Sequence, residues 1–246
     1  VLLTRTPVAS FAVNDNNKKT IYSLSGKYTF SDDLMVYATY GTAFRPGNGI
    51  VCARCTAAQG TALNAGGFLQ MPNETSNSAE IGFKSSWFDK RVTLNVSVFR
   101  QKFNNFAIIS PEQIPYLGTF TAGTPPTGTL AGSNNSFALP NTVKVTGVEA
   151  EFGWRVSDRL NFGGNVTFAD GKVENGRMPC IDLNNDNIQD ETAPTAADAN
   201  TLAAQAGATL VDTCAIKRAS PAPRWSGTFQ GEYNHPVGDT MQAYLR

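Results

Sequence analysis

The fold is decided most clearly by residues 147–168, which read GVEAEFGWRVSDRLNFGGNVTF. Apolar side chains recur at every second position from Val148 to Trp154, with Gly or Glu between them. After a short polar turn, the same alternation runs from Leu160 to Phe168. Alternation with a period of two places one face of a β-strand in an apolar medium and the other in a polar one. This stretch therefore predicts an antiparallel hairpin with two different faces.

The same alternation appears at residues 22–30, 94–98 and 225–233. Short turns rich in Asp, Asn, Ser or Gly are predicted at residues 31–33, 89–90, 156–158 and 234–239. Long segments lie at residues 45–73, 105–141 and 171–221, one after every second strand. Structureless loops of this length are rare inside a compact domain. The pattern predicts about eight strands in about four hairpins, with short turns at one end and long loops at the other.

Two architectures compete for these strands. A soluble β-sandwich packs its apolar face against a second sheet, and its strands are commonly about five or six residues long. The alternating runs here reach about ten to thirteen residues, which is the length a tilted strand needs to cross a bilayer. No run approaches about eighteen apolar residues, so a helical membrane span is excluded. Only 16% of the residues are charged, below the usual quarter.

The placement of charged and aromatic residues favours a membrane barrel. The predicted polar faces carry charges in mid-strand, at Lys27, Lys84, Glu149 and Glu151, and these suit a wet lumen better than a packed core. Aromatic residues lie beside the short turns, where an interfacial girdle is expected, at Phe30, Trp87, Phe88, Trp154 and Tyr233. We therefore predict an all-β, transmembrane antiparallel barrel with short periplasmic turns and long extracellular loops.

Composition and motifs argue against other functions. Twenty Lys and Arg residues balance twenty Asp and Glu residues, so charge gives no reason to expect a nucleic acid partner. The single histidine, His235, lies in a predicted turn, and no nucleophile, Walker or dinucleotide motif is present. Glu149 and Glu151 share a strand face, but charges lining a lumen explain them more simply than an acid–base pair. We predict that the protein is not an enzyme and that it requires no cofactor.

The four cysteines, Cys52, Cys55, Cys180 and Cys214, all lie in predicted long loops on the oxidising side of the membrane. Cys52 and Cys55 form a C-x-x-C motif that in a cytosolic protein indicates a redox centre or half a zinc site. No histidine accompanies them, so structural disulfides are favoured. Of the three pairings that four cysteines allow, we favour Cys52 with Cys55 and Cys180 with Cys214.

An acidic stretch in the third long loop has the spacing of a calcium-binding loop. Asp182, Asn184, Asp186 and Asp190 occupy relative positions 1, 3, 5 and 9, and Ile188 can offer its carbonyl oxygen. Asn187 stands where such loops usually have glycine, and the twelfth position holds Ala193 instead of a glutamate. The alternative is a solvated acidic loop. The spacing predicts a structural calcium ion outside the barrel.

Four motifs in order resemble the TonB-dependent outer-membrane receptors, in the C-terminal part of their β-barrel. They are residues 33–47 with Phe-Arg-Pro at the loop entry, residues 72–85 with the PNETSNSAEIGFK strand, residues 145–149 with Gly-Val-Glu, and residues 222–226 with Ala-Pro-Arg-Trp. The resemblance implies a bacterial outer-membrane barrel of about 22 strands, with an N-terminal plug and a segment that binds TonB. The chain has no initiator Met and ends within an alternating run, so residues 1–246 are expected to be one partial barrel domain, without plug or terminal strand.

The resemblance also implies function and partners. Receptors of this kind import a scarce solute, typically a ferric siderophore, with energy supplied through TonB, and they sit in outer-membrane lipid. Their loops and upper lumen meet the solute, which suggests as ligand contacts Phe44, Arg45, Tyr116, Phe120 and Phe137. Three alternatives stay open at this point: a passive porin or small complete barrel, a soluble β-sandwich that binds ligands, and an enzyme embedded in a barrel.

Overall fold

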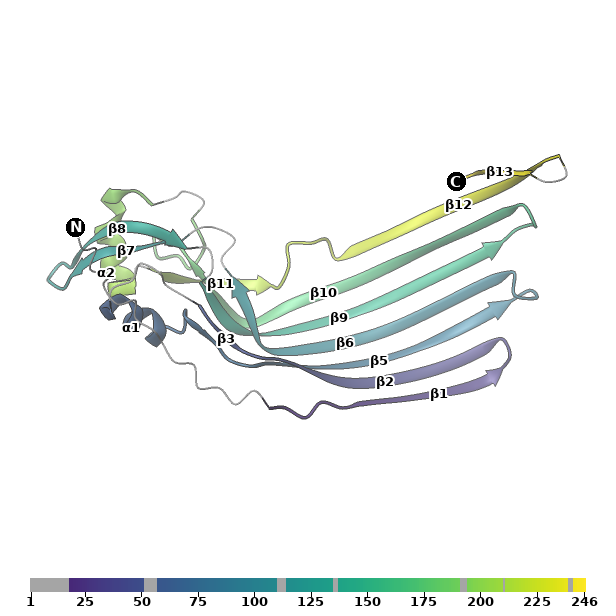
Figure 1. Ribbon diagram of the computed structural model, residues 1–246, viewed down its shortest axis with the longest axis horizontal. Helices are drawn as coiled ribbons and strands as arrows, with labels where there is room; N and C mark the ends of the chain where they lie inside the picture. Colours follow the sequence, from purple (N-terminus) through teal and green to yellow (C-terminus); the bar gives the residue numbers. More distant parts are fainter. Residues whose placement is uncertain are drawn as a thin grey trace, which may run out of the picture.

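Antiparallel strands make up most of the structure (Figure 1). The computed structural model describes residues 18–50, 57–109, 114–134, 137–190, 194–209, 211–238 and 241–246. Within these ranges, one nine-stranded sheet has the order β1-β2-β5-β6-β9-β10-β12-β13, and β11 pairs with β10. Its strands are β1 (Ser23–Ser31), β2 (Leu34–Arg45), β5 (Glu74–Trp87), β6 (Val92–Ile109), β9 (Ala138–Arg155), β10 (Leu160–Cys180), β11 (Asp212–Arg218), β12 (Trp225–Val237) and β13 (Met241–Leu245).

The predicted hairpins are the hairpins of this sheet. β1 pairs with β2, β5 with β6, β9 with β10, and β12 with β13, each across a short turn. One turn is shorter than predicted. β12 continues through residues 234–237, and His235 pairs with Ala243 as a strand residue, so its expected place in a turn is wrong. The chain reverses only after Val237, beginning at Gly238, whose φ of 71° suits glycine.

Strand register keeps one face of the sheet apolar. Phe83, Val96 and Ala150 lie directly opposite one another on neighbouring strands. One row towards the long loops, Ile81, Val98 and Val148 do the same. Large side chains on this face are exposed, 63% for Ile81 and 69% for Phe229. Exposed apolar surface on this scale is stable when lipid, not water, covers it. We call this surface the outer face and the opposite one the inner face.

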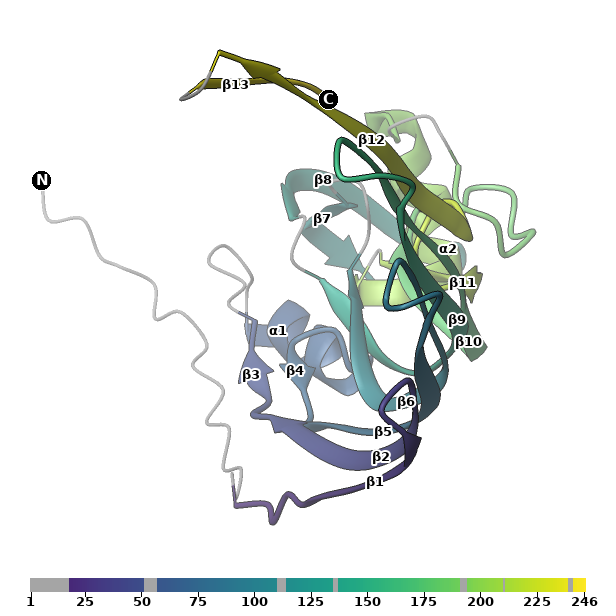
Figure 2. The same ribbon diagram turned by 90° about the vertical axis from the view of Figure 1, so that its right-hand side faces the viewer.

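The long loops fold together into one body at the end of the sheet away from the short turns (Figure 1). Figure 2 looks along the sheet from the short-turn end, with the curved sheet in front and the loop body behind it. Its elements are β3 (Asn48–Gly49), α1 (Ala57–Ala65), β4 (Gln70–Met71), β7 (Ile114–Thr121), β8 (Thr127–Asn134), η1 (Ala196–Asp198), α2 (Ala199–Ala206) and η2 (Gly207–Thr209). Among the described residues, no helix has both the length and the apolar character needed to cross a membrane.

The loop body has a hydrophobic core drawn from all three long loops. Leu63 and Phe68 come from the first loop, Phe137 from the second, and Ile181 and Val211 from the third, and all of them are buried. The rings of Phe68 and Phe137 lie 6.3 Å apart. Each loop alone carries too few apolar residues for a core, so the three stabilise one another.

Three central strands continue from the sheet into the loop body. β6, β9 and β10 are longer than the alternation predicts, since strand pairing resumes beyond irregularities that follow Phe103 and Lys172. Asn105 and Asn175 have positive φ angles of 59° and 48° near these irregularities, a conformation that asparagine tolerates. Between them, the amide nitrogen of buried Asn141 donates to the Leu139 and Arg177 carbonyl oxygens at 2.9 and 2.8 Å. This amide ties β9 to β10 where the sheet meets the loops.

Candidate functional site

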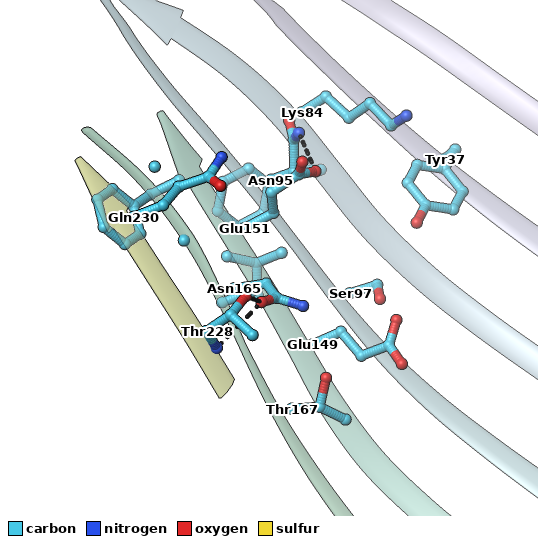
Figure 3. A pocket seen from close by; sticks show the side chains of 16 residues that line it. Tyr37, Lys84, Asn95, Ser97, Glu149, Glu151, Asn165, Thr167, Thr228 and Gln230 are labelled. Carbon is cyan, nitrogen blue, oxygen red and sulfur yellow. Dashed lines mark hydrogen bonds between the residues drawn. The ribbon is translucent and has the colours of Figure 1, made fainter. Parts of the chain in front are cut away.

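The inner face of the sheet carries a polar hollow of about 610 Å³. Its polar side chains come from alternate positions of neighbouring strands, and Figure 3 shows them together: Tyr37, Lys84, Asn95, Ser97, Glu149, Glu151, Asn165, Thr167, Thr228 and Gln230. The strand register places each of them on the face opposite Val96 and Ala150. The mid-strand charges Lys84, Glu149 and Glu151 therefore lie where the alternation predicts a wet lumen.

Hydrogen bonds run across the strands on this inner face. The side-chain amide of Asn95 donates to a Glu151 carboxylate oxygen at 3.2 Å. The Thr228 hydroxyl hydrogen-bonds to Asn165 Oδ1. The Tyr37 hydroxyl donates to Glu80 Oε1 at 2.7 Å. These contacts satisfy polar groups without closing the hollow, so the surface suits a hydrated solute that slides along it.

Nothing in this arrangement resembles a catalytic centre. Glu149 and Glu151 share the inner face, but the hollow's lining contains no histidine, cysteine or lysine beside them other than Lys84. His235 lies in the β12–β13 hairpin near a short turn, and its ring is 6.2 Å from that of Tyr233. Glu149 and Glu151 lie on the inner face, whereas His235 has the parity of the outer face.

The structure places the loop-entry candidates Phe44 and Arg45 on opposite faces. They end β2, and the register pairs Phe44 with Thr75 and Arg45 with Glu74. Arg45 lies on the inner face, where its guanidinium contacts the Glu74 carboxylate at 2.5 Å and stays 61% exposed. Phe44 has the parity of the outer face. Of the two predicted contacts, the position of Arg45 suits a solute in the lumen and the position of Phe44 does not.

The aromatic candidates in the second loop belong to the loop body. Phe137 is completely buried in the core, so the prediction of a stacking surface for a ligand is wrong at this residue. Phe120 is half-buried and packs against Leu202 and Ala203 of α2. Tyr116 lies in β7, opposite Gly132 of β8. When loops pack on one another, burial of their hydrophobic side chains is favourable, and a side chain buried in this way is not available to bind a solute.

The third loop is closed by a disulfide. Cys180 and Cys214 are bonded, with their Cα atoms 5.7 Å apart, and both are fully buried between β10 and β11. This is the pairing that the sequence favours. The bond closes a loop of 34 residues, which in the chain-entropy account adds about 3–4 kcal/mol of stability. Cys52 and Cys55 lie outside the described residues.

The acidic loop in the predicted calcium sequence is held by its own backbone. Asp182 is buried, and its two carboxylate oxygens accept from the N–H groups of Asp186 and Asn187 at 3.1 and 2.8 Å. Asp190 accepts from the Leu183 N–H at 2.7 Å. Across the part of the chain that the structure describes, no three acidic, His or Cys side chains cluster as metal ligands. The calcium prediction for Asp182, Asn184, Asp186, Ile188 and Asp190 therefore rests on their spacing alone.

Two carboxyl groups outside the membrane-spanning part of the chain titrate below their ordinary range. At the start of α2, the Thr195 backbone N–H and then its hydroxyl donate to Asp198, each at 2.7 Å, and hold its pKa low. At the loop end of β10, the Lys144 ammonium lowers the pKa of Glu174 by hydrogen bonding and charge, and Lys102 and Arg100 add to the effect. Both groups stay ionised at neutral pH.

Comparison with known proteins decides the family. The family described as TonB dependent receptor-like, beta-barrel, matches residues 4–244. The chain belongs to the TonB-dependent receptor family. Members of this family are receptors of the bacterial outer membrane and not enzymes, so the apolar outer face of the sheet is the side turned to outer-membrane lipid.

Solved structures of outer-membrane receptors are among the matches to this chain. FauA, the alcaligin receptor from Bordetella pertussis, is 18% identical, with a TM-score of 0.43 over 89% of this chain and 27% of its own. For the ferripyoverdine receptor of Pseudomonas aeruginosa the values are 14%, 0.48, 89% and 21%. For FyuA, the ferric yersiniabactin uptake receptor from Yersinia pestis, they are 14%, 0.49, 88% and 23%. The chain thus spans about a quarter of these receptors' length.

Sequence reasoning identified the wall of this receptor but not the lining of its hollow. The alternation placed Lys84, Glu149 and Glu151 on the polar face, and Asn165, Thr228 and Gln230 with them, but it did not show that these residues line one hollow. A signal in the sequence could have shown this. At a given distance from the short turn, each strand contributes one side chain from its polar face. Aligning the strands by their short turns brings these residues into one row.

Proposed function

We propose that this chain supplies part of the barrel wall and the extracellular loops of a receptor that imports a scarce solute, a ferric siderophore being the expected cargo, with energy supplied through TonB. The observation that carries the proposal is the two-faced sheet: an apolar outer face for lipid, and an inner face with a polar hollow of about 610 Å³. It stands together with membership of the family. A wall of this kind lets a bulky hydrated solute pass without entering lipid.

In this proposal the loop body captures the solute and the inner face receives it. Arg45 lies at the boundary between the two regions, with an exposed guanidinium anchored by Glu74. A guanidinium binds carboxylate and other oxyanion groups in a forked geometry, and ferric chelates commonly present such groups. Below it, Lys84, Asn95 and Glu151 offer donors and acceptors to a passing solute. The plug and the TonB-binding segment implied by the family would couple release to energy.

The test measures uptake by cells that carry the complete receptor. Cells starved of iron are given radioactive iron as catecholate, hydroxamate or hydroxycarboxylate chelates, with and without TonB. The proposal predicts uptake of at least one chelate that depends on both the receptor and TonB. Uptake that persists without TonB would instead favour a passive porin, and no uptake of any chelate would remove the ferric siderophore as cargo.

A substitution sharpens the test of the loop entrance. Arg45→Gln should weaken binding of an anionic chelate by about 10- to 150-fold, since one charge-assisted hydrogen bond contributes about 1.5–3 kcal/mol. Maximal uptake with saturating chelate should change little. Arg91→Gln, in a short turn at the other end of the wall, serves as the matched control and should leave both quantities unchanged. Equal effects of the two substitutions would contradict a role for Arg45 in capture.

A further inference from the structure

On the outer face, the apolar side chains give way to a row of basic side chains near the long loops. Directly opposite one another on four neighbouring strands lie the basic residues Lys102 of β6, Lys144 of β9, Lys172 of β10 and Arg218 of β11. Like charges placed opposite each other on neighbouring strands are destabilising. Such a row therefore needs negative charge nearby. Arg100 lies one row below, and Arg224 approaches Asp170 from the start of β12, so we call these six residues the basic band.

The carboxylates of the protein offset only part of this charge. Lys144 forms an ion pair with Glu174, while Lys172 and Arg224 share Asp170 at 3.3 and 2.9 Å. In the part of the chain that the structure describes, two carboxylates thus form ion pairs with a band of six cations. The side chains also stay accessible, with 69% of Lys172 and 49% of Arg224 exposed. The band keeps a net positive charge that an external anion can neutralise.

The height of the band matches the surface of the membrane. On β9, Lys144 lies ten residues from Trp154, the aromatic residue beside the short turn. A tilted strand crosses the hydrocarbon core in about 9–11 residues. If Trp154 marks one interface, the basic band therefore lies at the opposite one, among the head groups of the leaflet that faces the long loops.

An apolar groove lies directly beneath the band. Its volume is about 550 Å³, and the outer-face side chains Ala38, Ile81, Val98, Val148 and Phe168 line it, with Arg100 at its upper end. Ile81, Val98 and Val148 are 63%, 49% and 40% exposed. An apolar groove that continues into a cluster of cations has the polarity of one lipid molecule, with its acyl chains below and its anionic head group above.

We propose that the basic band and the groove beneath it form a binding site for a phosphate-bearing anionic lipid of the leaflet that faces the long loops. The phosphate lies among Lys102, Lys144 and Lys172, and an acyl chain lies along Val98 and Val148. Lysine stems lie along apolar surface while their ammonium groups reach the phosphate. The proposal uses only the membrane-facing side of the wall, so it stands whatever solute the receptor imports.

The test measures lipid binding by the complete receptor, purified in an uncharged detergent, using native mass spectrometry. Dioleoyl phosphatidic acid is the anionic probe, and dioleoyl phosphatidylcholine, whose phosphate is balanced by choline, is the neutral comparison. The site should retain the first at least tenfold more tightly than the second. Equal retention of both lipids would overturn the proposal. So would displacement of phosphatidic acid by an equal concentration of inorganic phosphate, which would indicate a site for free anions only.

Substitutions locate the site. A variant with Lys102→Gln, Lys144→Gln and Lys172→Gln should bind phosphatidic acid about 100-fold more weakly, since each basic group near an anionic surface contributes about fivefold. A matched control removes the same charge at the short turns, with Lys90→Gln, Arg91→Gln and Arg159→Gln, and should bind normally. Equal losses in both variants would show attraction to net charge alone and would contradict the site.

A third variant separates charge from folding. Replacing the same three lysines by arginine keeps the charge and should preserve binding within about threefold, because arginine also pairs with phosphate. Circular dichroism and the melting temperature show whether each variant is folded. A folded glutamine variant that still binds like the parent would overturn the proposal.

Discussion

The sheet and the loop body use the same apolar residues in opposite ways. Phe229 in the sheet is 69% exposed, whereas Phe137 in the loop body is completely buried. Phe137 packs with Leu63 and Phe68 in the core of the loop body. The membrane-spanning part of the sheet instead turns its large apolar side chains outward. The two regions belong to one chain, and β6, β9 and β10 run through both.

The difference teaches which solvent surrounds each region. In water, apolar surface is stabilised by burial, so the loop body must assemble a core. Against lipid there is no such driving force, and backbone hydrogen bonds between strands hold the wall instead. The same kind of substitution should therefore have different consequences in the two regions.

Truncation of a buried aromatic should affect only the loop body. Phe137→Ala leaves a cavity among Leu63, Phe68 and Ile181, and should lower the local unfolding free energy of the body by about 3–5 kcal/mol. Hydrogen exchange at the amides of α1, measured in the complete receptor, reports this change. Phe229→Ala is the control: its ring faces lipid, so the exchange at α1 should not change. Equal acceleration by both substitutions would mean that wall and body unfold as one unit.

Removal of the disulfide should also destabilise the body and spare the wall. The double substitution Cys180→Ser with Cys214→Ser frees a loop of 34 residues and should cost about 3–4 kcal/mol. The expected readout is faster hydrogen exchange in α2 and β11, with unchanged exchange in β5. Faster exchange throughout the sheet would contradict a separate loop body.

Charge on the outer face should damage the wall. Val96→Arg places a cation against hydrocarbon and should cost about 2–4 kcal/mol near the bilayer midplane. Asn95→Arg adds the same charge one residue away, on the inner face beside Glu151, and should cost little. Unfolding of the complete receptor in liposomes measures both. Equal costs would contradict the assignment of the two faces.

The smallest effect concerns a carboxylate in the loop body. Because Thr195 lowers the pKa of Asp198 in the folded state, the ionised form stabilises the start of α2. This contribution is present above the ordinary pKa of an aspartate and is lost as the pH falls through the lower, folded-state pKa. Asp198→Asn should therefore accelerate exchange in α2 at pH 6, and the difference should shrink as the pH falls through the folded-state pKa. A difference that grows on acidification would have the wrong sign.

Most of the wall could be predicted from the sequence. Alternation is a local signal, since the sequence of each strand alone shows which side chains face lipid and which face water. The long loop predicted at residues 45–73 fits the gap between β2 and β5. The same signal placed Val96 and Glu151 on opposite faces. It fails only where a strand leaves the membrane, as at residues 234–237, because a strand there needs no alternation and Asn234 and Pro236 resemble turn residues.

The loop body could not be predicted in the same way. Phe137 packs with Leu63 and Ile181, which are distant from it in the sequence, and the hydrophobic pattern within one loop does not predict this contact. The helices α1 and α2 are short and rich in alanine, a residue that favours helices but also occurs in loops. Phe137 therefore resembled an exposed ligand contact. Contacts between loops depend on the strands that bring the loops together.

The disulfide has one more consequence, which concerns enzymes that cut exposed proteins at the cell surface. A single break of the backbone anywhere between Cys180 and Cys214 leaves both new ends attached to the receptor, because the disulfide joins the chain segments on the two sides of the break. The nicked protein sheds no fragment, and its two pieces separate on a denaturing gel only after a reductant is added.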